Sequence, residues 1–145
     1  MPGQIPRRLA RYVSVLIILW ALFSSEAFGE NWPGWRGPRG DGSTATRIPT
    51  VWNGPSGKNI AWKTAIPGEG HSSPVVWGDN VLITTCIPDS GDRQLLCLER
   101  KTGQIRWQKS VLSSRLESKH ALNSYASSTP ATDGKLIYVS FLEVG

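Results

Sequence analysis

Cysteine and histidine are scarce in this chain, which has two of each among its 145 residues. Cys86 and Cys97 lack the spacing of a zinc site, and neither His71 nor His120 lies at ligand distance from them in the sequence. The sequence therefore predicts no metal centre in this stretch.

Helical periodicity is missing beyond the extreme N-terminus, because no later window repeats apolar residues at helical spacing over three turns. Instead, 15 glycines and 10 prolines are spread among short apolar runs. This composition is typical of strands joined by frequent turns. We therefore expect an all-β protein with little helix, and the length fits one domain.

A strong excess of charge of one sign is also missing. The net charge is +5, but three of the 16 basic residues and one of the 11 acidic residues lie before position 30. The remaining 13 basic and 10 acidic residues alternate in sign. Nucleic-acid binding requires clustered Lys and Arg with stacking aromatics or a recognition helix. We therefore expect no nucleic-acid partner.

Residues 1–29 have the layout of a secretory signal peptide. A basic head precedes the apolar run Val13–Phe23, and a polar tail follows it, with cleavage expected after Gly29 or Ala27. The run has 11 residues, whereas a membrane-spanning helix needs about 20. An uncleaved anchor is the alternative. We expect the mature protein to be periplasmic or secreted, with no stable membrane span.

Residues 30–58 form a lead-in rich in Gly, Pro and Trp, which indicates a wound loop. Burial of an indole is favourable, so Trp32 and Trp35 are expected to pack on an apolar surface, with Arg36 stacked on a ring. Arg39-Gly40-Asp41 matches an adhesion tripeptide, but such a short match arises readily by chance.

Residues 72–109 form one complete unit of four expected strands. These strands are Ser73–Trp77, Val81–Cys86, Arg93–Leu98 and Gln104–Lys109. The turn between the last two is Glu99–Gly103, where Gly103 suits a positive φ. A longer polar connection, 110–124, follows this unit.

The opening of the unit recurs 56 residues later, starting at Ser127. The matching pairs are Pro74 and Pro130, Gly78 and Gly134, and Val81 and Ile137. The second copy is expected to form strands over 127–132 and 136–142. Such a repeat indicates radially arranged four-stranded antiparallel blades, that is, a β-propeller.

Residues 59–145 then supply fewer than two blades of such a ring. Asn59–Thr64 is expected to be the outer strand of a further blade, because it shares an Ile-x-Trp pattern with Gln104–Lys109. A propeller needs roughly four to eight blades. We expect the chain to be an N-terminal fragment of a longer protein, the alternative being an open edge paired with another chain.

The two cysteines have two interpretations. Cys86 ends one expected strand and Cys97 lies in the next, so an oxidising compartment would let them join if they face each other. In the alternative, they are two small apolar residues on the faces of the sheet.

Two stretches of the first unit carry a family resemblance. They are Ser72-Ser-Pro-Val-Val76 and Leu96-Cys-Leu-Glu-Arg-Lys-Thr-Gly-Gln-Ile-Arg-Trp107. They resemble the repeats of pyrroloquinoline-quinone-like (PQQ-like) propellers, which bacterial quinoprotein dehydrogenases share with an outer-membrane assembly factor. In that family a Thr-Gly turn and a Trp dock neighbouring blades, which implies docking roles for Thr102, Gly103 and Trp107. Residues 32–38 and 120–130 are similar to exported propellers of planctomycete-type bacteria.

The resemblance implies PQQ as a cofactor only for the dehydrogenase branch. Such an enzyme needs an adjacent Cys pair, a bound Ca²⁺ and a carboxylate base. This chain has no adjacent Cys pair. Its acidic residues lie in apparent turns, where they are common for backbone reasons. We predict no catalytic residue here and assign no cofactor.

Four residues stand near the start of the two inner strands, and they are His71, His120, Asn123 and Tyr125. In a propeller this position lines one mouth of the channel, so these side chains are candidates to face a ligand. The alternative is that they are loop residues bonded to the backbone.

The absence of a catalytic constellation favours a protein-binding or scaffolding module of the cell envelope over an enzyme. Protein partners are expected there. Two other functions stay open: a quinoprotein dehydrogenase whose site lies in other blades, and the sensor module of a signalling protein.

Overall fold

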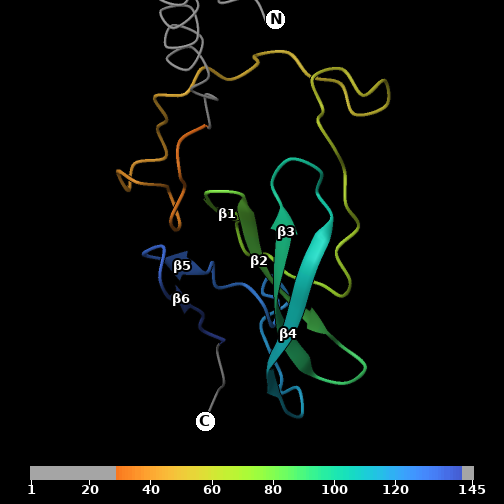
Figure 1. Cartoon of the computed structure of the whole chain (residues 1–145). Helices are drawn as coiled ribbons and strands as arrows, with labels where there is room; N and C mark the ends of the chain where they lie inside the picture. The colour runs from red at the N-terminus through yellow and green to blue at the C-terminus, as the bar shows by residue number, and fades with distance from the viewer. Residues whose placement is uncertain (1–28, 142–145) are drawn as a thin grey trace, which may run out of the picture.

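Short apolar runs between turn residues build the main sheet of the protein, seen in a computed structural model that describes residues 29–141. The four antiparallel strands are β1 (Val75–Trp77), β2 (Asn80–Ile87), β3 (Asp92–Glu99) and β4 (Ile105–Ser113), in that order across the sheet (Figure 1). A two-stranded hairpin follows, formed by β5 (Ala131–Thr132) and β6 (Ile137–Tyr138). The described residues contain no helix, which confirms the all-β expectation.

Both faces of the four-stranded sheet are apolar, because strands β2 and β3 alternate buried residues toward each side. One face carries the cluster Val75, Leu82, Leu95 and Cys97, with Val139 from beyond β6 packed against it. The opposite face carries Val81, Leu96 and Leu98, covered by Trp62 and Ile66 from the preceding chain. The sheet is therefore a middle layer between two other segments.

Strand β4 is longer than the sequence predicted. The expected strand ended at Lys109, whereas β4 continues to Ser113 and takes up the first part of the expected polar connection. The continuation stays paired, with Gln94 opposite Ser110 and Asp92 opposite Ser113. The pairing of β3 with β4 is irregular at two places, between Arg93 and Gln94 and between Cys97 and Leu98.

The expectation of an outer strand at Asn59–Thr64 is wrong, because this segment forms no strand. Asn59 has a φ of 56°, in the left-handed region that a regular strand does not enter. The segment instead crosses the apolar face that contains Leu96, and its Ile-x-Trp pattern reflects packing rather than pairing. β6 also covers only Ile137–Tyr138 of the expected 136–142, the last residue of which lies outside the described part of the chain.

The disulfide considered from the sequence does not form, since Cys86 and Cys97 are both free and buried. The register pairs Cys97 with Leu82 and Cys86 with Arg93. Four residues of strand separate these positions, which is about 13 Å at 3.3 Å per residue. A disulfide needs Cα atoms within about 7 Å.

The expected signal peptide falls almost entirely on residues 1–28, which lie outside the described part of the chain, as do residues 142–145. Over residues 29–141, no helix has the length and apolar character needed to cross a membrane.

Candidate functional site

The turn between β3 and β4 packs against the side chain of a tryptophan, Trp62. Gly103 has a φ of 72°, and a Cβ at this position would lie 2.4 Å from Cε3 of Trp62. The Trp62 Nε1–H donates to Arg100 O at 2.8 Å, and the Thr64 hydroxyl donates to Gly103 O at 2.6 Å. Only glycine leaves room for the indole ring at this turn.

Thr102 stabilises the turn from within. Its hydroxyl donates to Glu99 Oε2 at 2.9 Å and accepts the Gln104 N–H at 3.2 Å. Arg106 Nη2 lies 2.6 Å from Glu99 Oε1. Hydrogen bonds from Arg106 first, and then from Thr102, lower the pKa of Glu99. Thr102 therefore shapes the turn that Gly103 opens to the indole.

Sequence reasoning missed Trp62 as the partner of this turn. The resemblance implied a docking role for Trp107, and the structure places Trp107 beside Cys97, on the opposite face of the sheet. Its side chain is 40% exposed. The signal for Trp62 was present in the sequence, because Ile60 and Ile105 both stand two residues before a tryptophan.

The four candidate channel-mouth residues lie in two loop segments that are bonded to each other. The His71 N–H donates to Ala126 O, and to Ser124 Oγ, at 3.1 Å in each case. His120 Nδ1 accepts the Leu122 N–H at 3.2 Å, and His120 O accepts the Asn123 N–H at 2.9 Å. These contacts are with the backbone or with a serine, which fits loop residues rather than an assembled ligand site.

Tyr125 is held by cations and by the backbone. Its hydroxyl donates to Glu117 O. The Arg93 guanidinium lies 5.7 Å from the centre of the Tyr125 ring, and Lys119 Nζ lies 5.1 Å from it. Both distances fall in the range of cation–π attraction, so Tyr125 ties the connection after β4 to the start of β3.

Equivalent positions of the two repeats bond directly to each other. The Ser73 N–H donates to Thr129 Oγ1 at 3.0 Å, and these two residues are 56 positions apart. The Thr84 hydroxyl donates to Ser128 O at 3.1 Å. The second repeat therefore starts beside the first one, with the equivalent residues Ser73 and Thr129 next to each other.

A cavity of about 130 Å³ is lined by residues of both the sheet and the β5–β6 hairpin. Its lining is Trp77, Asn80, Leu82, Cys97 and Trp107 from the sheet, and Thr132, Gly134, Lys135 and Ile137 from the hairpin. Asn80 Oδ1 accepts hydrogen bonds from Cys97 Sγ at 3.3 Å and from Arg106 at 2.9 Å. Burial raises the pKa of the Cys97 thiol.

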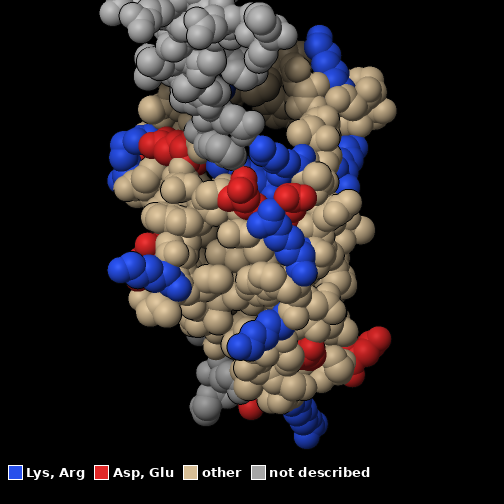
Figure 2. Space-filling view, in the orientation of Figure 1, with Lys and Arg blue, Asp and Glu red and all other residues tan. Residues whose placement is uncertain are grey.

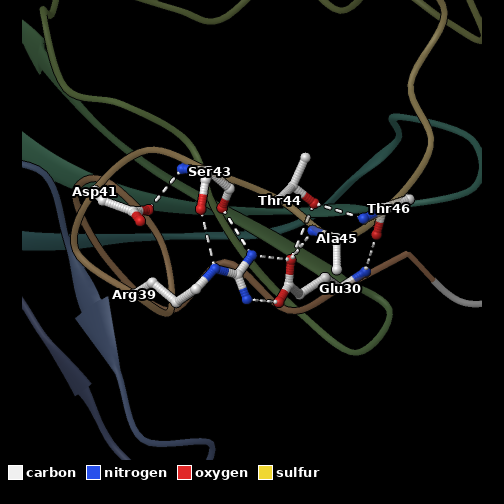
Figure 3. Close-up of polar contacts among 7 residues, drawn as sticks. All are labelled: Glu30, Arg39, Asp41, Ser43, Thr44, Ala45 and Thr46. Carbon is white, nitrogen blue, oxygen red and sulfur yellow. Dashed lines mark hydrogen bonds and ion pairs between the residues drawn. The ribbon is translucent and has the colours of Figure 1, made fainter.

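The lead-in is closed by a polar clasp, which we define as Glu30, Arg39, Ser43, Thr44, Ala45 and Thr46 (Figure 3). Arg39 reaches both carboxylate oxygens of Glu30, at 2.7 and 3.0 Å. Hydrogen bonds from Arg39 first, then from Ala45 and Thr44, lower the pKa of Glu30 to about 2. Asp41 accepts the Ser43 N–H at 2.8 Å. Both charged groups of the adhesion-like tripeptide are therefore engaged within the loop.

Trp32 and Trp35, the lead-in tryptophans that were expected to pack on an apolar surface, differ in environment. Trp32 is partly buried, whereas Trp35 is 68% exposed, so the expected burial of Trp35 is wrong. The Arg36 guanidinium lies 5.2 Å from the centre of the Trp35 ring, which confirms the expected stacking.

Comparisons of the chain with family models, curated proteins and solved structures give no match. Within residues 29–141, no group of three or more His, Cys, Asp or Glu side chains is placed to hold a metal ion. Conclusions about function therefore depend on the geometry of the sheet, its turns and the hairpin.

Proposed function

We propose that the chain begins an exported PQQ-like β-propeller, which serves as a protein-binding scaffold in the cell envelope. The two apolar faces of the sheet support this proposal. A sheet must bury each apolar face against another layer, and stacked repeats supply such layers in series. Here one face is covered by the preceding segment and the other by the start of the next repeat.

The contact between Trp62 and the Glu99–Gly103 turn carries the proposal. It joins a tryptophan that precedes the sheet to a turn inside the sheet. Trp107 has the same Ile-x-Trp context and is partly exposed on the other face. In a following blade, the turn that corresponds to Glu99–Gly103 would pack against Trp107, as Glu99–Gly103 packs against Trp62.

A scaffold role is supported by the surface of the protein. Lys and Arg are interspersed with Asp and Glu on the face shown in Figure 2, with no broad patch of one sign. Rigid repeats with polar connecting loops present those loops to protein partners. Such a surface suits short-range recognition better than long-range attraction of a polyanion.

The proposal is tested by affinity capture from an envelope extract, with the intact protein as bait and a Trp62→Ala variant as control. The native bait should recover specific proteins that the variant loses, because the variant loses the packing of the sheet. Failure of the native bait to recover any specific protein would contradict the scaffold role, whereas recovery of the same proteins by both baits would show that partner binding does not depend on the Trp62 contact. Quinone absorbance in the purified intact protein would favour the dehydrogenase instead.

A further inference from the structure

The first strands of the two repeats turn the same backbone position toward the lead-in. Val76 in β1 and Thr132 in β5 are 56 residues apart, which is one repeat period. The Val76 N–H donates to Trp32 O at 2.9 Å, and the Thr132 N–H donates to Pro33 O at 2.8 Å. Two consecutive carbonyl groups of the lead-in therefore accept hydrogen bonds from equivalent positions of consecutive repeats.

These contacts lie on the edge of each strand that faces away from its own sheet partner. β1 pairs with β2 on its other side, and β5 pairs with β6 in the same way. The Trp32 N–H also donates to Val76 O at 2.7 Å, so these two residues form an antiparallel bridge. Edge groups of this kind are otherwise open to pairing with another chain. Residues 31–34, which we call the edge segment, therefore take the place of a further strand beside both repeats.

Asn31 supplies an acceptor that the first repeat lacks. In the second repeat, the Gly134 N–H donates to Thr132 Oγ1 of the same repeat at 3.0 Å. Val76 stands at the equivalent position of the first repeat and has no hydroxyl group. The Gly78 N–H donates instead to Asn31 Oδ1, at 2.8 Å. The edge segment thus completes the first repeat at a point where the second repeat completes itself.

The rest of the lead-in holds the edge segment in place. The Trp32 ring packs on Gly37, where a Cβ would lie 2.6 Å from the ring. The ion pair between Glu30 and Arg39 joins the chain before the segment to the chain after it (Figure 3). The segment belongs to the orange loop of Figure 1, whose tip lies next to β5. It is therefore a seated part of the fold.

We infer that the edge segment closes the axial channel of the proposed propeller along its first two repeats. The inference rests on the proposed function, since only a closed ring has such a channel. The inner strands of a propeller surround the channel, and in this ring β1 and β5 are the inner strands of their repeats. A segment that pairs with the inner edges of both strands lies on the channel side. Partners of the scaffold then bind the connecting loops instead of the channel.

This closure has a chemical consequence for ligands. The N–H groups of Val76, Gly78 and Thr132 all donate to the edge segment. A ligand with oxygen acceptors, such as a quinone or a carboxylate, would have to displace the segment to reach these donors. The closure therefore favours the scaffold over an enzyme with a cofactor in this part of the channel.

An engineered disulfide in the intact protein tests how the edge segment is seated. A Cβ at Gly34 would lie 3.7 Å from Ala131 Cβ, and disulfides need a Cβ separation of about 3.5–4.5 Å. Gly34→Cys with Ala131→Cys should therefore cross-link nearly completely under mild oxidation, as read by peptide mass spectrometry. The control pair is Gly54→Cys with Ala131→Cys, because a Cβ at Gly54 has no atom of Ala131 within 4 Å. Neither glycine has a positive φ. No cross-link in the first pair, or equal cross-linking of both, would overturn the inference.

A milder substitution tests the contact of Asn31. Asn31→Ala removes the acceptor of the Gly78 N–H, so hydrogen exchange of the Gly78 amide should become severalfold faster. Adding Val76→Thr supplies a hydroxyl group like that of Thr132 and should slow this exchange again. Unchanged exchange in Asn31→Ala would overturn the inference.

A crystal structure of the intact protein separates the closure from the proposed function. The expected result is a ring with residues 31–34 in its channel. A ring with these residues outside the channel would overturn the closure and leave the propeller standing. A chain that forms no ring would overturn the proposed propeller and the closure with it, while the cross-link would still show whether the edge segment joins the two repeats.

Discussion

A methyl group added at Gly103 should destabilise the protein by about 2–5 kcal/mol, from two separate causes. An alanine at a φ of 72° costs about 1–2 kcal/mol, because its Cβ crowds the following carbonyl. The new Cβ would also lie 2.4 Å from the Trp62 ring, and overpacking of this kind costs about 1–3 kcal/mol. The assay is urea unfolding of the intact protein, read at the midpoint with the slope unchanged.

Gly78→Ala is the matched control for the backbone cause. Gly78 has a φ of 54°, and nothing lies within 4 Å of the position of its Cβ. This variant should therefore cost only about 1–2 kcal/mol. If Gly103→Ala costs no more than Gly78→Ala, the indole does not pack on the turn.

A double-mutant cycle isolates the contact itself. Trp62→Ala alone should cost about 2–4 kcal/mol, because it removes a partly buried indole and its hydrogen bond to Arg100 O. In that background Gly103→Ala should cost only its backbone strain. The coupling energy should thus be about 1–3 kcal/mol. If the free-energy costs of Trp62→Ala and Gly103→Ala are simply additive, the Trp62 ring does not pack against Gly103.

Three further measurements test other parts of the structure. Thiol titration of the unfolded, unreduced protein should find both Cys86 and Cys97 free, and a bonded pair would contradict the strand register. The pKa of Glu30 is lowered from 4.5 to about 2, so its contribution to stability is present above pH 4.5 and is lost as the pH falls toward 2. Urea midpoints measured over that range should fall less steeply in Arg39→Gln than in the native protein, and equal slopes would contradict the clasp. Trp107→Ala should cost about 3–5 kcal/mol in the intact protein if a further blade covers the indole. A cost under about 1 kcal/mol would leave Trp107 on the surface.

The strands of the first unit could be predicted because their local signals agree. Gly78, Gly91 and Gly103 all adopt positive φ in turns between strands, and apolar runs lie between them. Turn residues and apolar periodicity therefore indicated the same boundaries to within a few residues. The extension of β4 to Ser113 escaped prediction, because it depends on the length of the partner strand β3, which continues to Asp92 opposite Ser113.

The docking contact could be predicted only in part. The turn itself is a local feature, and Gly103 was identified from the sequence for its positive φ. Which tryptophan reaches it depends on the path of the chain across the sheet, a property of tertiary packing. Alternation in Asn59–Thr64 was interpreted as strand pairing, whereas Trp62 in fact packs over a sheet face. Periodicity identifies a residue that faces an apolar surface, but it does not identify that surface.

The hydrogen bond from Ser73 to Thr129 has a consequence for how such a chain can change in length. Donor and acceptor occupy corresponding positions one period apart, so each of the two repeats contributes the same position to the bond. Duplication or loss of a whole period would regenerate this join without any new substitution. An extra residue within β2 or β3 would instead shift the strand register between the donor and its acceptor, whereas extra residues in an exposed turn would not. Growth by whole modules therefore keeps this bond.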